Sequence, residues 1–254
     1  MEPHPVHYNY PMKFPKINTL WKRDMTRTVK RKGVILEGFY SEKAFKTIKL
    51  WKVKEKVHGE NIRIFVDFIP GNLELPHIWI GGRNDTDNPE INEELLHYIK
   101  THINIESLRK AFTKGSFGTD NCPRRAMIFG EGYGGDIKHG HSYIDHSEFV
   151  VFDIVIDSWW LEYNNVKIIA AKLGLKSVPM LKNLMSVEEI IDYVKSEPQS
   201  KLSDKPRIIE GVVCDSAPLL MTRRGDPLKF KLKVDDFKNL KSMEDKEKEK
   251  RQKK

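Results

Sequence analysis

Cysteine is scarce in this chain of 254 residues, and long apolar runs are absent. Its two cysteines, Cys122 and Cys214, stand far apart, so we expect neither a disulfide framework nor a cysteine-ligated zinc site. No stretch approaches the roughly 20 apolar residues of a membrane-spanning helix. The N-terminus lacks the basic and then apolar pattern of a signal peptide. We therefore expect an intracellular, cytoplasmic protein (host-cell cytoplasm if viral) that is not secreted and has no membrane partner.

Charge, by contrast, is abundant. The formal net charge is +8, and apolar and charged residues make up 39% and 31% of the chain, as in globular proteins. Residues 229–254 hold 11 basic and 6 acidic residues, and such a surplus attracts polyanions such as nucleic acid or an acidic membrane. The terminal run at 246–254 also fits a solvated tail. We expect one folded domain over residues 1–240 and a basic, disordered tail over 241–254.

Apolar residues alternate in some segments and follow helical spacing in others, which predicts an α+β domain with antiparallel sheets flanked by helices. Strands are expected at residues 50–68, with a break at 57–61, and at 78–80, 126–129, 148–156, 207–214 and 228–234. Helices are expected after an Asn88–Pro89 cap, after Asn104 with Ile105 inward, from Trp159-Trp160 onward, and after a capping box of Ser186 and Glu189.

The most informative segment is residues 54–61, Lys-Glu-Lys-Val-His-Gly-Glu-Asn. Lys56 ends a strand and meets a tight turn at Gly59, where the backbone can approach a ligand closely. Neighbouring cations or desolvation can lower a lysine pKa enough for nucleophilic attack. Taken alone, the segment fits a surface hairpin with a charged tip equally well.

This segment resembles the lysine motif of covalent nucleotidyltransferases, which comprise DNA ligases, RNA ligases and mRNA capping enzymes. In DNA ligases and capping enzymes the third motif position is usually Asp, whereas here it is His58. The string Glu-Lys-Val-His-Gly-x-Asn is similar to the RNA ligase 2 family, which includes the kinetoplastid editing ligases. Glu60 departs from the small residue that this family often has there.

Further elements resemble those of the family in the expected order and cover residues 14–237. They are the N-terminal entry strand Phe14-Pro15-Lys16-Ile17, then Gly81-Gly82-Arg83-Asn84, Ile128-Phe129-Gly130-Glu131-Gly132, Phe149-Val150-Val151-Phe152-Asp153-Ile154, Glu210-Gly211-Val212-Val213 and Lys231-Leu232-Lys233. Lys229 alternates with Lys231 and Lys233 on the same strand, and the register that uses the last two places Phe237 at the family spacing. Each element alone is a weak signal, but their order is specific.

The resemblance implies an ATP-grasp-like ligase adenylation domain and an ATP-dependent RNA ligase. Lys56 would take AMP from ATP, the AMP would pass to the 5′-phosphate of an RNA end, and a 3′-hydroxyl would displace it. The implied cofactors are ATP and Mg²⁺, or Mn²⁺. The implied partners are RNA with 5′-phosphate and 3′-hydroxyl ends and a separate RNA-binding protein in trans, because only a short basic tail follows the last element.

The resemblance also implies roles for individual residues. Lys231 and Lys233 would neutralise the α-phosphate and keep Lys56 deprotonated by like-charge proximity, and Glu210 would hold the metal. The remaining roles are Glu55 at the adenine edge, Phe152 and Val212 on the two adenine faces, Glu131 on the ribose, Arg83 on phosphate or ribose oxygens, Asn61 near the phosphates, and His58 and Asp153 orienting the phosphate and the lysine turn.

Other interpretations stay open on the residues alone. Phe152 also fits a core phenylalanine, whereas Glu131 and Glu210 on apolar strands need a partner or a function. We expect exposed histidines rather than metal ligands at His139, His141 and His146. The glycines at 130–135 lack the Gly-Lys-Ser/Thr of a P-loop. Alternatives for the whole chain are a DNA ligase, a capping-type nucleotidyltransferase, or a non-catalytic RNA-binding protein that retains the fold.

Overall fold

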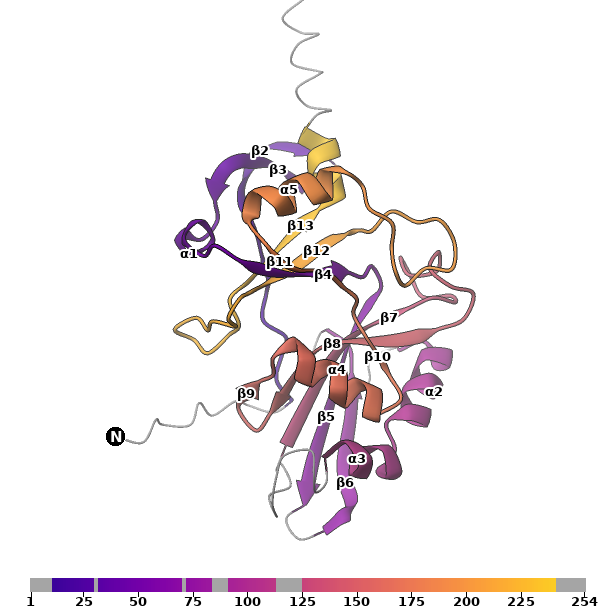
Figure 1. The fold of residues 1–254 in the computed structure, drawn as a ribbon. Helices are drawn as coiled ribbons and strands as arrows, with labels where there is room; N and C mark the ends of the chain where they lie inside the picture. The colour runs from indigo at the N-terminus through magenta and orange to yellow at the C-terminus, as the bar shows by residue number, and fades with distance from the viewer. Residues whose placement is uncertain (1–10, 30–31, 70–71, 84–90, 113–124, 241–254) are drawn as a thin grey trace, which may run out of the picture. The chain divides into compact units, whose positions relative to one another are not determined.

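The computed structural model describes residues 11–29, 32–69, 72–83, 91–112 and 125–240 (Figure 1). The chain divides into two compact units. Unit 1 comprises residues 1–15, 57–178 and 202–205, and unit 2 comprises residues 16–56, 179–201 and 206–254. Lys56 is the last residue of its segment of unit 2, and Val57 is the first of the main segment of unit 1. The lysine motif therefore runs from one unit into the other.

Unit 1 is built on a six-stranded sheet. In sheet order its strands are β10 (Lys176–Ser177), β8 (Glu148–Ile156), β7 (Arg125–Tyr133), β5 (Glu60–Ile69) and β6 (Asn72–Gly81), with β9 (Trp159–Trp160) pairing beside β8. Only β10 runs parallel to its neighbour among these described strands. The helices are α2 (Glu93–His102), α3 (Ile105–Phe112) and α4 (Tyr163–Lys172).

Strand alternation separates the two faces of this sheet. Ile62, Ile64 and Val66 of β5 belong to one apolar core with Leu108 of α3 and Ile169 of α4. Because side chains alternate along a strand, the residues between those of β5 lie on the opposite face. That face carries the polar residues of the candidate site.

Unit 2 is built on a five-stranded mixed sheet. Its order is β1 (Asn18–Thr19), β13 (Lys229–Lys233), β12 (Gly211–Ser216), β4 (Trp51–Lys56) and β11 (Met180–Met185), and only β1 and β13 are parallel among these pairs. The unit also contains the hairpin of β2 (Trp21–Val29) and β3 (Lys32–Tyr40), helices α1 (Lys43–Thr47) and α5 (Val187–Lys195), and a helical stretch at 234–240. Its core joins Trp51, Val212, Phe230 and Leu232 to the hairpin and to α5.

The predicted α+β class with antiparallel sheets is confirmed, with parallel pairing added at β1 and β10. Strand β8 has the predicted bounds. The capping box is present at α5, since Ser186 accepts from the Glu189 amide while the Glu189 carboxylate accepts from the Ser186 amide. Asn104 caps α3 by accepting from the Ser107 amide.

Several element predictions were wrong. Trp159-Trp160 is strand β9 rather than a helix start, because this pair returns antiparallel to β8. Ile105 is 40% exposed rather than inward. The N-cap of α2 is Asn92, whereas Asn88 and Pro89 lie outside the described residues. Residues 14–17 are not in a strand, and β1 begins only at Asn18. The β2–β3 hairpin and the 234–240 helix were not predicted.

Cys122 and the tail at 241–254 lie outside the described residues, so the domain boundary at 240 stays a prediction. Cys214 is a free, buried thiol. Among the described residues, no helix combines the length and the apolar character of a transmembrane span.

Candidate functional site

A carboxylate held between two lysines lies where three strands of unit 2 meet. Gly211, the first residue of β12, is opposite Lys56 on one side and Lys233 on the other. Lys56 Nζ donates to Glu210 Oε2 across 2.6 Å, and Lys233 Nζ donates to Glu210 Oε1. The three side chains are largely buried. Residues from distant parts of the sequence therefore form one ion-paired group around Lys56.

The carboxyl of Glu210 is ionised in this group. Burial alone would raise the pKa of Glu210, but the charges of Lys56 and Lys233 hold it below its usual value. Glu210 is therefore a carboxylate at neutral pH. Glu210 lies between the amines of Lys56 and Lys233 and is ion-paired with both. The expectation that Lys231 and Lys233 keep Lys56 deprotonated by like-charge proximity stays a prediction.

Lysines line one face of the unit 2 sheet. Strand register places Lys52, Lys54 and Lys56 of β4 on the same face as Lys229, Lys231 and Lys233 of β13, with Val213 and Asp215 of β12 between them. Asp215 is buried and ion-paired with Lys54 at 2.7 Å and with Lys229 at 3.1 Å. Lys229 is thus engaged in a buried cluster, which favours Lys231 and Lys233 as the Lys-x-Lys pair.

The opposite face of this sheet is the apolar core, and Val212 lies on it. Val212 is fully buried and is paired in register with Glu55 and Leu232, not with a lysine. The expectation that Val212 covers adenine is therefore corrected, because its side chain points away from the face that carries Lys56. Val213 is half-buried on the lysine face and is the better candidate.

Glu55 shares the core face with Val212. Its carboxylate accepts from Ser200 Oγ at 2.5 Å and from the Lys201 amide at 3.0 Å. Burial raises the pKa of Glu55 despite these hydrogen bonds and the nearby basic groups. Glu55 therefore ties residues 200–201 to β4, and its reading of the adenine edge stays a prediction.

The turn after Lys56 belongs to unit 1 and is held there by two hydrogen bonds. The His58 amide donates to Tyr143 Oη at 3.1 Å, and the Gly59 amide donates to Glu131 Oε1 at 3.2 Å. A Cβ on Gly59 would lie 2.0 Å from the carbonyl oxygen of Gly132. Only glycine fits this approach of two backbones, so the glycine of the motif sets the shape of the turn.

The His58 ring also has a partner that the sequence did not indicate. His139 stacks on His58 with ring centroids 4.9 Å apart and planes at 4°. His139 adopts φ +70°, a left-handed conformation that non-glycine residues rarely take. His139, His141 and His146 are exposed, as predicted. His139 is nevertheless positioned against the motif, which its place in a polar loop could not reveal.

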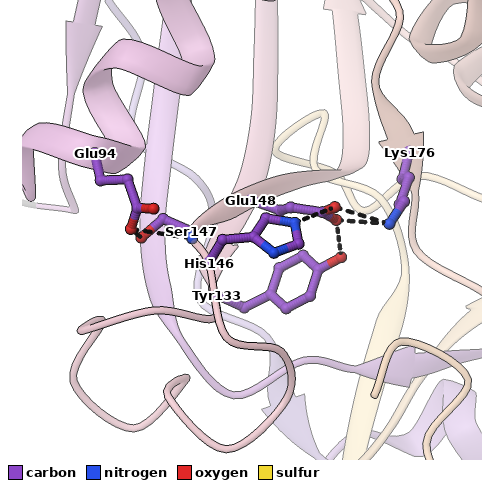
Figure 2. A network of polar contacts seen from close by, with 6 residues as sticks. All are labelled: Glu94, Tyr133, His146, Ser147, Glu148 and Lys176. Atoms are coloured by element: carbon purple, nitrogen blue, oxygen red, sulfur yellow. Dashed lines mark hydrogen bonds and ion pairs between the residues drawn. The ribbon is translucent and has the colours of Figure 1, made fainter. Parts of the chain in front are cut away.

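A polar network fixes the end of the loop that carries His139 and Tyr143 (Figure 2). Glu148 accepts from Tyr133 Oη at 2.5 Å and from Lys176 Nζ at 2.7 and 3.0 Å, and His146 Nε2 lies 3.1 Å from it. Burial would raise the pKa of Glu148, but these three partners hold it below its usual value.

Next to it in Figure 2, Ser147 donates to Glu94 at the start of α2, through its hydroxyl at 2.5 Å and its amide at 3.1 Å. These contacts belong to strands and a helix of unit 1, so the loop between Tyr133 and Glu148 ends on rigid elements. That anchoring supports the placement of His139 and Tyr143 against the turn.

The other predicted residues of unit 1 are distributed over the polar face of its sheet. Asn61 of β5 is directly opposite Glu131 of β7. The β7–β8 pairing shifts register between Phe129 and Gly130, which makes Phe152 the extra residue of a β-bulge beside Asp153. Bulges re-aim side chains and are frequent next to active sites.

Phe152 is half-buried, with Phe14 packed edge-on at 4.8 Å. Asp153 is buried and lies opposite Phe129 in the register. The core interpretation of Phe152 and the adenine-stacking interpretation are both compatible with this partial burial.

Arg63 was missed by the sequence reasoning. It is fully buried, with Nε donating to the Gly82 carbonyl at 2.7 Å and Nη1 to the Met12 carbonyl at 3.2 Å. Trp79 lies under its guanidinium at 5.2 Å. Arg63 therefore fixes the backbone immediately before Arg83, which is exposed. An arginine between the apolar Ile62 and Ile64 was the available signal.

The residues present fit a metal held by few protein ligands. Among the described residues, no three His, Cys, Asp or Glu side chains are grouped to hold an ion. Mg²⁺ in nucleotide sites keeps several waters and uses one or two carboxylates plus phosphates. Glu210, a carboxylate next to Lys56, suits that pattern.

Comparison with known proteins identifies the family. A family model described as RNA ligase matches residues 49–231. The chain belongs to the RNA ligase family. The matched range of this RNA ligase family member contains Lys56, Glu210 and Lys231, whereas Lys233 lies just beyond it. No curated protein matches the chain.

Solved structures of the Naegleria gruberi RNA ligase have a similar fold. A point mutant with AMP and Mn is 17% identical, with a TM-score of 0.54 over 88% of this chain and 62% of that one. An apo point mutant is 15% identical, with a TM-score of 0.53 over 96% and 64%. The ligase with PPi is 18% identical, with a TM-score of 0.51 over 91% and 64%. This family member thus spans less than two thirds of these relatives, and the likeness concerns the fold.

Proposed function

We propose that the chain is an ATP-dependent RNA ligase in which Lys56 Nζ attacks the α-phosphorus of ATP. A phosphorus–nitrogen bond forms, the bond to the β-phosphate oxygen breaks, pyrophosphate leaves and a proton is released. An oxygen of the 5′-phosphate of an RNA end then attacks the same phosphorus, so that a phosphorus–oxygen bond forms, the phosphorus–nitrogen bond breaks and the lysine amine is released. A 3′-hydroxyl finally attacks the activated 5′-phosphate, a phosphodiester bond forms, and AMP and a proton leave.

The observation that carries this proposal is the Lys56–Glu210–Lys233 group. It combines an amine at a strand end, a second amine for phosphate charge and one carboxylate, which are the parts that phosphoryl transfer to lysine requires. Membership in the RNA ligase family supports the same chemistry.

The neighbouring groups suit this role. Lys231 lies on the same sheet face as Lys56 and Lys233 and would contact phosphate oxygens. Because Glu210 is ion-paired with both lysines, a triphosphate competes with it for Lys233, and Lys56 must leave its ion pair to attack. A divalent ion, when bound, neutralises triphosphate charge, and Glu210 would hold it.

Roles for unit 1 follow the family resemblance. Glu131 and the Tyr143 hydroxyl hold the turn at 58–59, so that the backbone after Lys56 keeps one conformation. We assign Phe152, and Val213 in place of Val212, to adenine. Glu131 is assigned to the ribose, Asn61 to the phosphates and Arg83 to phosphate or ribose oxygens. His58 and Asp153 are assigned to orienting the phosphate and the lysine turn. The assignment of Glu55 to the adenine edge is retained as part of this proposal.

The test is covalent labelling. Protein incubated with ATP and Mg²⁺, or Mn²⁺, should gain the mass of one AMP, and peptide mapping should place the adduct on Lys56. Lys56→Arg, which keeps the charge but not the nucleophilicity, should gain none. Transfer of the label to a 5′-phosphorylated RNA, and joining to a 3′-hydroxyl end, test the later steps.

The same experiment separates the alternatives. Labelling by GTP alone would indicate a capping-type enzyme, and joining of DNA ends in preference to RNA would indicate a DNA ligase. Wild-type protein that remains unlabelled, like Lys56→Arg, would leave only an RNA-binding protein with a ligase fold.

A further inference from the structure

Basic residues concentrate in one part of unit 2. The segment Lys16–Lys56 holds thirteen basic and four acidic residues, a net charge of +9. This is more than the net charge of +8 of the whole chain. Within it, residues 43–52 hold four lysines and no acidic residue. Lys43, Lys46 and Lys49 are exposed, and the structure gives none of them an ion pair among the residues it describes.

A second basic segment is joined to the first by the backbone. The Ala217 amide donates to the Leu50 carbonyl at 3.1 Å, directly after the pairing of Ser216 with Trp51. The loop that starts there carries Arg223 and Arg224, both exposed, at its turn. In Figure 1 this loop, in gold, and α1, in indigo, lie at the same end of β4.

We name this feature the basic end surface and define it by Lys43, Lys46, Lys49, Arg223, Arg224 and Met221. It differs from an ordinary solvated charged face because large apolar side chains are exposed within it. Met221 is 44% exposed, and the adjacent Leu220 and Leu50 are 41% and 43% exposed. Asp226 is the acidic residue of the loop, and it is half-buried.

We infer that the basic end surface binds an RNA strand, with its lysines and arginines on phosphates and its apolar side chains against bases. A cluster of exposed cations attracts a phosphate backbone, and apolar contacts suit unstacked bases. This inference rests on the proposed function for the identity of the nucleic acid.

The surface begins at the end of β4 opposite Lys56, the proposed nucleophile. Trp51 and Lys56 are the ends of β4, and five residue steps of a strand span about 17 Å. A stacked nucleic acid strand rises about 3.4 Å per nucleotide, so an RNA end at Lys56 would reach the surface after about five nucleotides. The surface should therefore act on longer RNAs and not on very short ones.

The experiment measures RNA affinity against salt. We would compare wild type with the triple variant Lys43→Gln, Lys46→Gln, Lys49→Gln, using a 5′-phosphorylated single-stranded RNA longer than the predicted reach. Loss of three phosphate contacts should reduce the slope of log affinity against log salt by about 2. Arg223→Gln with Arg224→Gln should reduce it further. An RNA of three or four nucleotides should show little difference.

The matched control removes three exposed lysines from unit 1, as Lys100→Gln, Lys110→Gln and Lys167→Gln on α2, α3 and α4. It should leave the slope nearly unchanged. Labelling with ATP alone should be unaffected in every variant, which separates failure of this inference from failure of the proposed function.

An equal slope in the two triple variants would overturn the inference. So would a basic end surface variant that loses binding to vesicles of acidic lipid while its RNA affinity stays unchanged, because the surface would then bind lipid.

Discussion

Lys56 Nζ lies 2.6 Å from Glu210 Oε2, and this ion pair joins the end of β4 to the residue just before β12. The contact places the amine of the proposed nucleophile against this carboxylate. Its neighbours on the same sheet face are further lysines, and the next carboxylate along that face is Asp215. Substitutions on this face should therefore fall into two classes: those that change the stability of the sheet and those that change the proposed reaction with ATP.

Asp215 should control the acid stability of unit 2. Burial would raise the pKa of Asp215, but Lys229 and Lys54 hold it below its usual value of 3.8. A group with a lowered folded-state pKa stabilises the fold above its unfolded pKa and loses that contribution as pH falls through the folded value. Wild type should therefore lose stability below about pH 4, as measured by denaturant unfolding.

Asp215→Asn should cost about 3–5 kcal/mol at neutral pH, because two buried lysines lose their partner, and should flatten this acid dependence. Asp192→Asn, an exposed position on α5, is the control and should change little. An acid profile of Asp215→Asn identical to wild type would contradict the assignment.

Val212 and Val213 provide a matched pair on opposite faces of β12. Val212→Ala should destabilise the protein by about 2 kcal/mol through a core cavity, with little change in ATP affinity. Val213→Ala should change stability less and raise the ATP concentration needed for half-maximal labelling of Lys56. Thermal unfolding would measure the stability of both variants, and labelling kinetics would measure their dependence on ATP. A change in ATP dependence for Val212→Ala and not for Val213→Ala would return Val212 to the nucleotide site.

Gly59→Ala should distort the turn and slow the labelling of Lys56 without unfolding the sheet. The added Cβ would meet the Gly132 carbonyl at 2.0 Å, so the backbone must move. Displacement of reacting groups by about 1 Å can slow chemistry about 100-fold, and single-turnover labelling would measure this. Gly38→Ala is the control, since its Cβ meets nothing within 4 Å, although φ +86° there adds some strain. Normal labelling by Gly59→Ala would refute a role for the close approach.

His139 should act through His58 rather than on the nucleotide. His139→Ala removes the stacked ring and should slow labelling by about tenfold, by loosening the turn. His139→Phe keeps an aromatic face and should recover most of the rate, while the ATP concentration for half-maximal labelling stays near wild type in both variants. If alanine and phenylalanine are equally slow, the imidazole acts by its chemistry and not by stacking.

The sequence predicted those parts of the fold that depend on local patterns. Strand β8 and the capping box at Ser186 depend on neighbouring residues, and both were correct. Trp159-Trp160 failed because its strand pairing depends on a return to β8, which tertiary structure decides. The β2–β3 hairpin has irregular register at two places, and so it lacks a clean alternation.

The candidate site was predictable as a set of residues but not as a set of contacts. The family resemblance indicated Lys56, Glu210 and Lys233, yet their shared ion pair depends on strand register across more than 150 positions. The prediction assigned Val212 rather than Val213 to adenine because the motif does not say which valine points to which face of the sheet. Only the strand register decides this. His139 and Arg63 belong to no recognised element, and their roles come from packing.

The alternation of β4 has a consequence for mutation by insertion or deletion. Val53 and Glu55 point to the core, while Lys52, Lys54 and Lys56 point the other way. Gaining or losing one residue inside this strand would exchange the two sets and bring ammonium groups into hydrocarbon. Natural variants should therefore show no insertions or deletions of one residue within these six positions.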